Sequence, residues 1–134
     1  MNNFEFGEKM RARTKKFAVK VIKSYRKLPR ADEARILGKQ LIRAGTSVAA
    51  NYRAVCRAKS NADFISKLGT TLEEADESLL WLELLEDSET VPPGTFKELM
   101  READELLRIF SCSRATARHS QTPKLLNSQT SQDS

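Results

Sequence analysis

The sequence predicts an all-α protein that folds as an antiparallel up-down-up-down four-helix bundle. Apolar residues recur in steps of three and four over four long segments, which is the spacing of an amphipathic helix. Short connections join these segments, as in bundles of this topology. Glycine and proline are scarce, at 5 and 4 of 134 residues, and charged residues make up 31%. This composition favours long helices over a β-sandwich, and the length suits one domain.

The first helix is expected over residues 5–28 and is ended by Pro29, because the residue before a proline avoids the helical conformation. Its apolar stripe consists of Phe6, Met10, Phe17, Val21, Tyr25 and Leu28. A second helix is expected over residues 33–59, with Asp32 as its N-cap. Its apolar face consists of Ile36, Leu37, Leu41, Ala44, Val48, Tyr52 and Val55.

Two further features of these helices concern their neighbours. Gly38 and Gly45 lie inside the second helix, where each costs about 1 kcal/mol relative to alanine. Such glycines often permit another backbone to approach closely. Some apolar residues lie partly off the main stripes, which indicates a wide core or a subunit interface. These are Phe4, Val19, Ile22 and Ile42.

The third helix is predicted to begin at Ser60, with Asp63 completing a short version of the capping box. Its stripe consists of Phe64, Leu68, Leu72, Ala75, Leu79, Leu82 and Leu85. Residues 90–95, "TVPPGT", predict a loop. Thr95 and Glu98 predict a full capping box for the fourth helix. The apolar residues of that helix are Phe96, Leu99, Met100, Ala103, Leu106, Leu107 and Phe110.

The bundle domain is expected to span residues 1–118, followed by a disordered polar tail over 119–134 that is rich in Ser, Thr and Gln. Cys56 and Cys112 lie far apart and form no CxxC motif, so reduced thiols in a cytoplasmic protein are expected, with Cys56 as a small packed residue. No apolar stretch approaches 18 residues, so no membrane span is expected.

No catalytic constellation is visible, and we expect neither an enzyme, nor a cofactor, nor a metal site. The sequence holds one histidine, His119, in the polar tail. Glu74 and Glu77 form a single E-x-x-E pair, whereas dimetal bundles use Glu-x-x-His motifs on several helices. P-loop and dinucleotide-binding glycine patterns do not occur.

Charge is distributed unevenly. Residues 1–60 carry 16 Lys and Arg against 4 Asp and Glu, whereas residues 61–110 carry 4 against 13. On the first helix, basic residues repeat by three or four and form a ridge of Lys9, Arg13, Lys16, Lys20, Lys23 and Lys27. Arg53 and Arg57 of the second helix extend this basic half. The pattern indicates a surface for nucleic-acid phosphates, or a basic face that is neutralised by acidic helices.

The stretch "SVAANYRAVCRAKSNADFISKL", followed by "EEADESLLWLELL", resembles the bacterial 23S rRNA-intervening-sequence proteins, a family of four-helix bundles. The likeness covers about residues 5–110, and its motif residues are Asn51, Tyr52, Ser60, Phe64, Glu77 and Trp81. The resemblance implies a cytoplasmic ring-shaped homo-oligomer, typically a pentamer, without enzymatic activity. Distantly similar bundles are accessory subunits of retroelement reverse transcriptases, where they contact RNA and protein.

The motif residues each have a structural and a functional interpretation. Asn51 is read as a buried amide that fixes helix register, with Glu77 as a possible partner, rather than as a ligand-binding group. Where the family often has a glutamate and then a small residue, this chain has Ala54 and Val55. Trp81 lies among leucines, so packing in the core or an interface is favoured over base stacking.

The sequence therefore predicts a non-enzymatic, ring-forming bundle that binds RNA or DNA phosphates through its basic first helix. The alternative is a protein-interaction scaffold that docks an acidic protein partner without nucleic acid.

Overall fold

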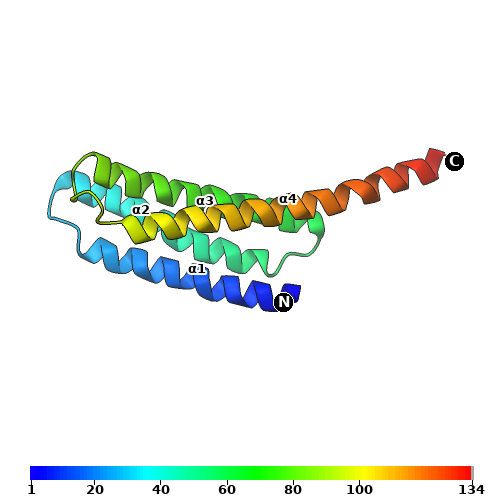
Figure 1. Ribbon diagram of the computed structural model, residues 1–134, viewed down its shortest axis with the longest axis horizontal. Helices are drawn as coiled ribbons and strands as arrows, with labels where there is room; N and C mark the ends of the chain where they lie inside the picture. The colour runs from blue at the N-terminus through cyan, green and yellow to red at the C-terminus, as the bar shows by residue number, and fades with distance from the viewer. Residues whose placement is uncertain (134) are drawn as a thin grey trace.

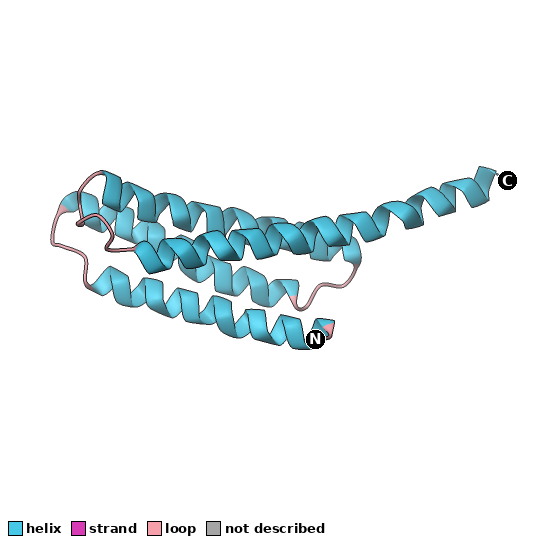
Figure 2. Cartoon of the chain, in the orientation of Figure 1, coloured by secondary structure: helices cyan, strands magenta, loops and turns pink. Residues whose placement is uncertain are grey.

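The computed structural model describes the backbone of residues 1–133 and the side chains of residues 1–120. Four helices pack into one bundle, and residues 1–133 contain no β-strand (Figures 1 and 2). The helices are α1 (Asn3–Arg26), α2 (Asp32–Val55), α3 (Asn61–Asp87) and α4 (Lys97–Asp133). The predicted all-α bundle is confirmed. Among the described residues, no helix is both long enough and apolar enough to cross a membrane.

The core is built from most of the predicted stripe residues, but Phe6 on α1 and Ile36 on α2, both expected in the stripes, are exposed. Its largest fully buried side chains are Phe17, Phe110, Met10, Leu41, Leu68, Leu82, Leu85 and Leu106. Ile36, expected in the core, is 63% exposed. Near the start of α2, the buried positions are occupied by Ala34 and Gly38 instead. A residue two places from Ala34 lies about 200° around the helix axis and faces outward.

Two glycines let α2 approach α1 closely, as predicted. A Cβ atom on Gly45 would lie 2.9 to 3.1 Å from three side-chain atoms of Val21. A Cβ atom on Gly38 would lie 2.5 Å from Cδ1 of Leu28. Real Cβ contacts are almost never this short, so the close α1–α2 contact depends on glycine, which has no side chain, at these two positions.

The start of α3 follows the predicted capping pattern, whereas the start of α2 does not. Ser60 Oγ accepts a hydrogen bond from the Asp63 amide at 3.0 Å, and Asp63 Oδ2 accepts from the Lys59 amide at 3.0 Å. The Lys67 ammonium, 2.8 Å away, and the Lys59 amide lower the pKa of the Asp63 carboxyl. On α2, Ala31 takes the N-cap position and Asp32 is the first helical residue, so the predicted Asp32 cap is wrong.

The loop before α4 is organised by a residue of α3 rather than by the predicted Thr95–Glu98 capping box. The Glu86 carboxylate accepts hydrogen bonds from the amides of Gly94 and Phe96, at 2.9 and 2.8 Å. The Thr95 hydroxyl instead donates to the carbonyl of Pro92. A carboxylate from the preceding helix thus satisfies two backbone amides at the start of α4.

The C-terminal segment is helical, although its composition predicts a disordered tail. Within residues 97–120 of α4, the last buried side chain is that of Ala117, whose carbonyl accepts a hydrogen bond from Asn61 Nδ2 at 3.0 Å. Beyond this point the backbone of α4 continues to Asp133 and projects past the other three helices (Figure 1). Lengthening an existing helix requires no new nucleus, which explains how a polar segment can extend α4.

A chain that ends after Arg118 is expected to keep its melting midpoint within a few degrees of the full-length value. The interhelix contacts described above end at Ala117. Thermal unfolding followed by circular dichroism measures this. Loss of cooperative unfolding in the shortened chain would show that residues 119–134 support the bundle.

Candidate nucleic-acid interface

Five of the six predicted ridge residues lie exposed along α1 and its C-cap. The inward face of this helix carries the buried residues Met10, Thr14, Phe17, Ala18 and Val21, and the lysines lie on the exposed flank of the helix that borders α4. Lys9, Lys16, Lys20, Lys23 and Lys27 are exposed and form no ion pair with residues 1–120. Their charges are therefore available to a ligand.

Arg13, the sixth ridge residue, is already paired. Its Nε and Nη2 atoms donate to the two carboxylate oxygens of Glu102 on α4, at 2.9 and 2.7 Å. Nη2 also lies 2.9 Å from a Glu105 oxygen. Hydrogen bonding of Arg13 to the Glu102 carboxylate, and to a smaller extent to Glu105, raises the pKa of Arg13 above its ordinary value. Arg13 thus joins α1 to α4, and the free part of the ridge consists of lysines.

The α4 side of the ridge has mixed charge. A groove of about 500 Å³ between α1 and α4 is lined by Lys9, Arg13, Lys16, Phe17, Lys20, Glu98, Arg101, Glu102 and Glu105. Carboxylates along one wall weaken the attraction of this groove for an anion, because like charges repel at short range. A polyanion would therefore contact the lysine ridge on the side that points away from these carboxylates.

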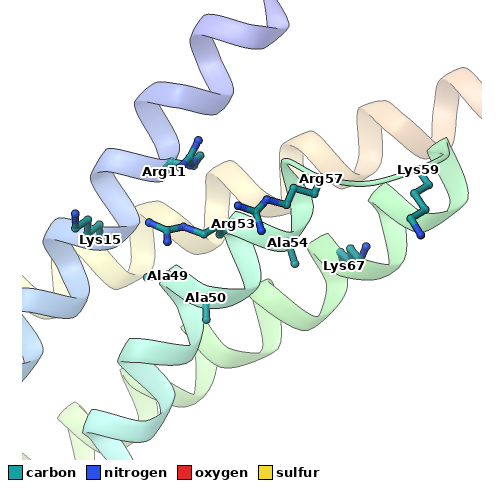
Figure 3. A pocket seen from close by; sticks show the side chains of 9 residues that line it. All are labelled: Arg11, Lys15, Ala49, Ala50, Arg53, Ala54, Arg57, Lys59 and Lys67. Atoms are coloured by element: carbon teal, nitrogen blue, oxygen red, sulfur yellow. The ribbon is translucent and has the colours of Figure 1, made fainter.

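Arg53 and Arg57 lie on a different surface, over the outward face of α2 (Figure 3). There they line a groove of about 570 Å³ whose other basic residues are Arg11, Lys15, Lys59 and Lys67. Three small residues, Ala49, Ala50 and Ala54, complete its wall. The predicted binding residues thus divide between two basic surfaces. The grouping of cations from α1, α2 and α3 was missed because it depends on tertiary packing.

The motif residues Tyr52, near the end of α2, and Phe64, on α3, pack in or against the core. Tyr52 is buried, and its ring stacks on Phe110 of α4 with centroids 5.6 Å apart. Burial raises the pKa of the Tyr52 phenol to about 12. Phe64 is half-buried against the same core. Cys56, expected to be packed, is exposed, with its sulfur 3.9 Å from the Gly7 carbonyl oxygen.

Asn51 and Glu77 do not pair as predicted. Asn51 is half-buried, and its side chain makes no hydrogen bond with residues 1–120. Glu77 instead forms an ion pair with Arg43 and accepts a hydrogen bond from Trp81 Nε1 at 3.2 Å. Glu74 also contacts Arg43, at 3.4 Å. The E-x-x-E pair therefore binds an arginine that lies across the α2–α3 contact.

Comparison with known proteins identifies a protein family and a similar solved structure. Among curated proteins, no significant match is found. A similar solved structure is that of a protein of unknown function from the S23 ribosomal protein family of Bacteroides thetaiotaomicron. It is 30% identical, with a TM-score of 0.75, over 81% of this chain and 97% of that one. A family model described as 23S rRNA-intervening sequence protein matches residues 9–112. The chain belongs to the family of 23S rRNA-intervening sequence proteins.

Proposed function

We propose that this protein is a non-enzymatic bundle that binds the phosphates of RNA or DNA through the lysine ridge of α1, as an accessory factor. The supporting observation is the row of exposed lysines from Lys9 to Lys27, none of which pairs within residues 1–120. At about 1.5 Å per residue the row is about 27 Å long. A rigid row of cations of this length suits successive phosphates along a nucleic-acid backbone.

Phosphate contacts fix the position of a protein on a nucleic acid without reading its bases. Binding is therefore expected to depend strongly on salt and weakly on sequence. Gel-shift titrations with two unrelated RNAs and two unrelated DNA duplexes, each at 50 and 200 mM salt, test this. We expect similar affinities among sequences and a large loss of affinity at the higher salt. No binding at the lower salt, or binding that is insensitive to salt, would contradict the proposal.

We further propose that the antiparallel bundle assembles as a ring-shaped homo-oligomer of five subunits. Large apolar side chains remain exposed on several helices, which is typical of a surface that another subunit covers. They include Phe4, Val19, Ile36, Leu80 and Leu84. A ring would repeat the lysine ridge around its axis, and joint contact can raise apparent affinity by about 10²–10⁴.

Light scattering at micromolar protein concentration is expected to give a mass of about five 15.1 kDa chains. The same measurement at high salt is expected to leave the mass unchanged if apolar side chains form most of the interface, because burial of apolar surface is not screened by salt. A particle of single-chain mass would rule out the assembly.

The alternative is a protein-interaction scaffold in which α1 docks an acidic protein partner. The Arg13 contacts with Glu102 and Glu105 favour this possibility, because they show α1 binding carboxylates. Gel-shift experiments separate the two proposals, since a scaffold for acidic proteins is expected to ignore generic RNA at physiological salt.

A further inference from the structure

The groove over the outward face of α2 is distinct from the lysine ridge and is built differently. Its cations are Arg11 and Lys15 on α1, Arg53 on α2, Arg57 and Lys59 in the α2–α3 connection, and Lys67 on α3. Figure 3 shows these side chains around the segment of α2 that carries Ala49, Ala50 and Ala54. Elements far apart in the sequence thus concentrate positive charge in one place.

Carboxylates neutralise only part of this charge. Glu8 binds Arg11 at 2.8 Å, and Asp63 binds Lys67 at 2.8 Å. The side chains of Lys15, Arg53, Arg57 and Lys59 form no ion pair with residues 1–120. In addition, the Arg11 Nε atom is buried and has no hydrogen-bond acceptor. The groove therefore holds a surplus of cations and a guanidinium group whose hydrogen-bonding capacity is only partly used.

The two grooves differ in their lining. Alanine methyl groups on α2 leave room beside the arginines, whereas the groove that Lys9, Lys16 and Lys20 line also carries the carboxylates of Glu98, Glu102 and Glu105. An internal phosphodiester carries one negative charge, whereas a terminal phosphate carries about −1.5 to −2 at neutral pH. Clustered cations in a concave site match the denser charge better than the spaced charges of a backbone.

We propose that this groove binds clustered terminal phosphates, the chemistry shared by a 5′-triphosphate end of a nucleic acid and by free pyrophosphate. Arg53 and Arg57 would contact the phosphate oxygens, because their planar guanidinium groups donate paired hydrogen bonds to such oxygens. In its strand-end form the inference rests on the proposed nucleic-acid binding, and it adds the feature of the strand that the protein recognises.

The test compares one short unstructured RNA carrying either a 5′-triphosphate or a 5′-hydroxyl group, by fluorescence anisotropy at 150 mM salt. The wild-type protein is expected to bind the triphosphate form about tenfold more tightly. The variant Arg53→Gln/Arg57→Gln is expected to lose this preference, measured as the ratio of its affinities for the two RNAs. Equal binding of both RNAs by the wild-type protein would exclude recognition of strand ends by the groove and leave the proposed function standing.

Two matched variants exclude a general effect of charge or folding. Arg35→Gln/Lys39→Gln removes two exposed cations at the same spacing on α2 but outside the groove, and is expected to keep the preference. Arg53→Lys/Arg57→Lys keeps the charge and is expected to retain part of the preference for the triphosphate RNA. Loss of the preference in the Arg35/Lys39 variant would contradict the assignment to this groove.

Calorimetric titration with pyrophosphate identifies the source of the phosphates. Binding that Arg53→Gln/Arg57→Gln weakens supports a site for the free anion. A triphosphate preference without pyrophosphate binding assigns the site to strand ends. Pyrophosphate binding by a protein that binds neither RNA would support the groove and contradict the proposed function. Absence of both pyrophosphate binding and end preference would remove the groove from the account.

Discussion

Replacing Gly45 with leucine is expected to lower the free energy of unfolding by about 1–2 kcal/mol. A Cβ at this position would already lie 2.9 to 3.1 Å from three atoms of Val21, so the larger side chain must push α1 and α2 apart. Overpacking of this kind typically costs about 1–3 kcal/mol, and the better helix propensity of leucine recovers up to about 1 kcal/mol at most. Urea denaturation followed by circular dichroism measures the change.

A compensating substitution and a matched control make this result specific. Val21→Ala combined with Gly45→Leu is expected to be less destabilised than the sum of the two single variants, because the alanine vacates the space that the leucine needs. Ala50→Leu, on the exposed face of the same helix, is expected to change stability by less than about 0.5 kcal/mol. Equal stabilities of Gly45→Leu and Ala50→Leu would show that the close α1–α2 contact is unimportant.

The features that were predictable from the sequence are those that depend on local periodicity. The stripes of Phe17, Leu41, Leu68 and Leu106 identified the core because one helix face repeats every three or four residues. The glycines of α2 indicated a close helix contact for a similarly local reason. Ile36 was misplaced because alanine and glycine at Ala34 and Gly38 carry little apolar signal although they are buried.

The remaining features depend on contacts between distant parts of the chain. Glu86 accepts hydrogen bonds from loop amides eight and ten residues later, and the Thr95 hydroxyl donates to the Pro92 carbonyl instead of capping α4. Arg13 meets Glu102, 89 residues later, so the ridge has one member fewer than its periodicity suggests. The groove that contains Arg53 required the packing of α1, α2 and α3 to be known.

Changing Lys16, Lys20, Lys23 and Lys27 together to glutamine is expected to cause the largest loss of function. Glutamine is nearly as good a helix former as lysine, and all four side chains are exposed, so the bundle is expected to stay intact. Each phosphate contact that is lost is expected to flatten the log–log salt dependence by about 0.7–0.9. The loss of affinity is expected to be the same for unrelated sequences, since phosphate contacts carry no base information.

Two comparisons separate phosphate binding from other roles of these lysines. The same four positions changed to arginine keep their charge and are expected to bind with an affinity close to that of the wild-type protein. If the ridge instead pairs with acidic helices of a neighbouring subunit, the glutamine variant is expected to lose oligomer mass or thermal stability while any nucleic-acid affinity stays unchanged. Light scattering and thermal unfolding of the variant distinguish these outcomes.

The most direct test of the proposed function is the slope of log binding constant against log salt concentration, measured for the wild-type protein and the four-lysine variant on one generic RNA. Phosphate binding by the lysine ridge predicts a steep slope for the wild-type protein and a slope flatter by about 0.7–0.9 for every phosphate contact that the variant has lost. Identical slopes and identical affinities, in a variant that keeps its fold and its oligomer mass, would contradict nucleic-acid binding through α1.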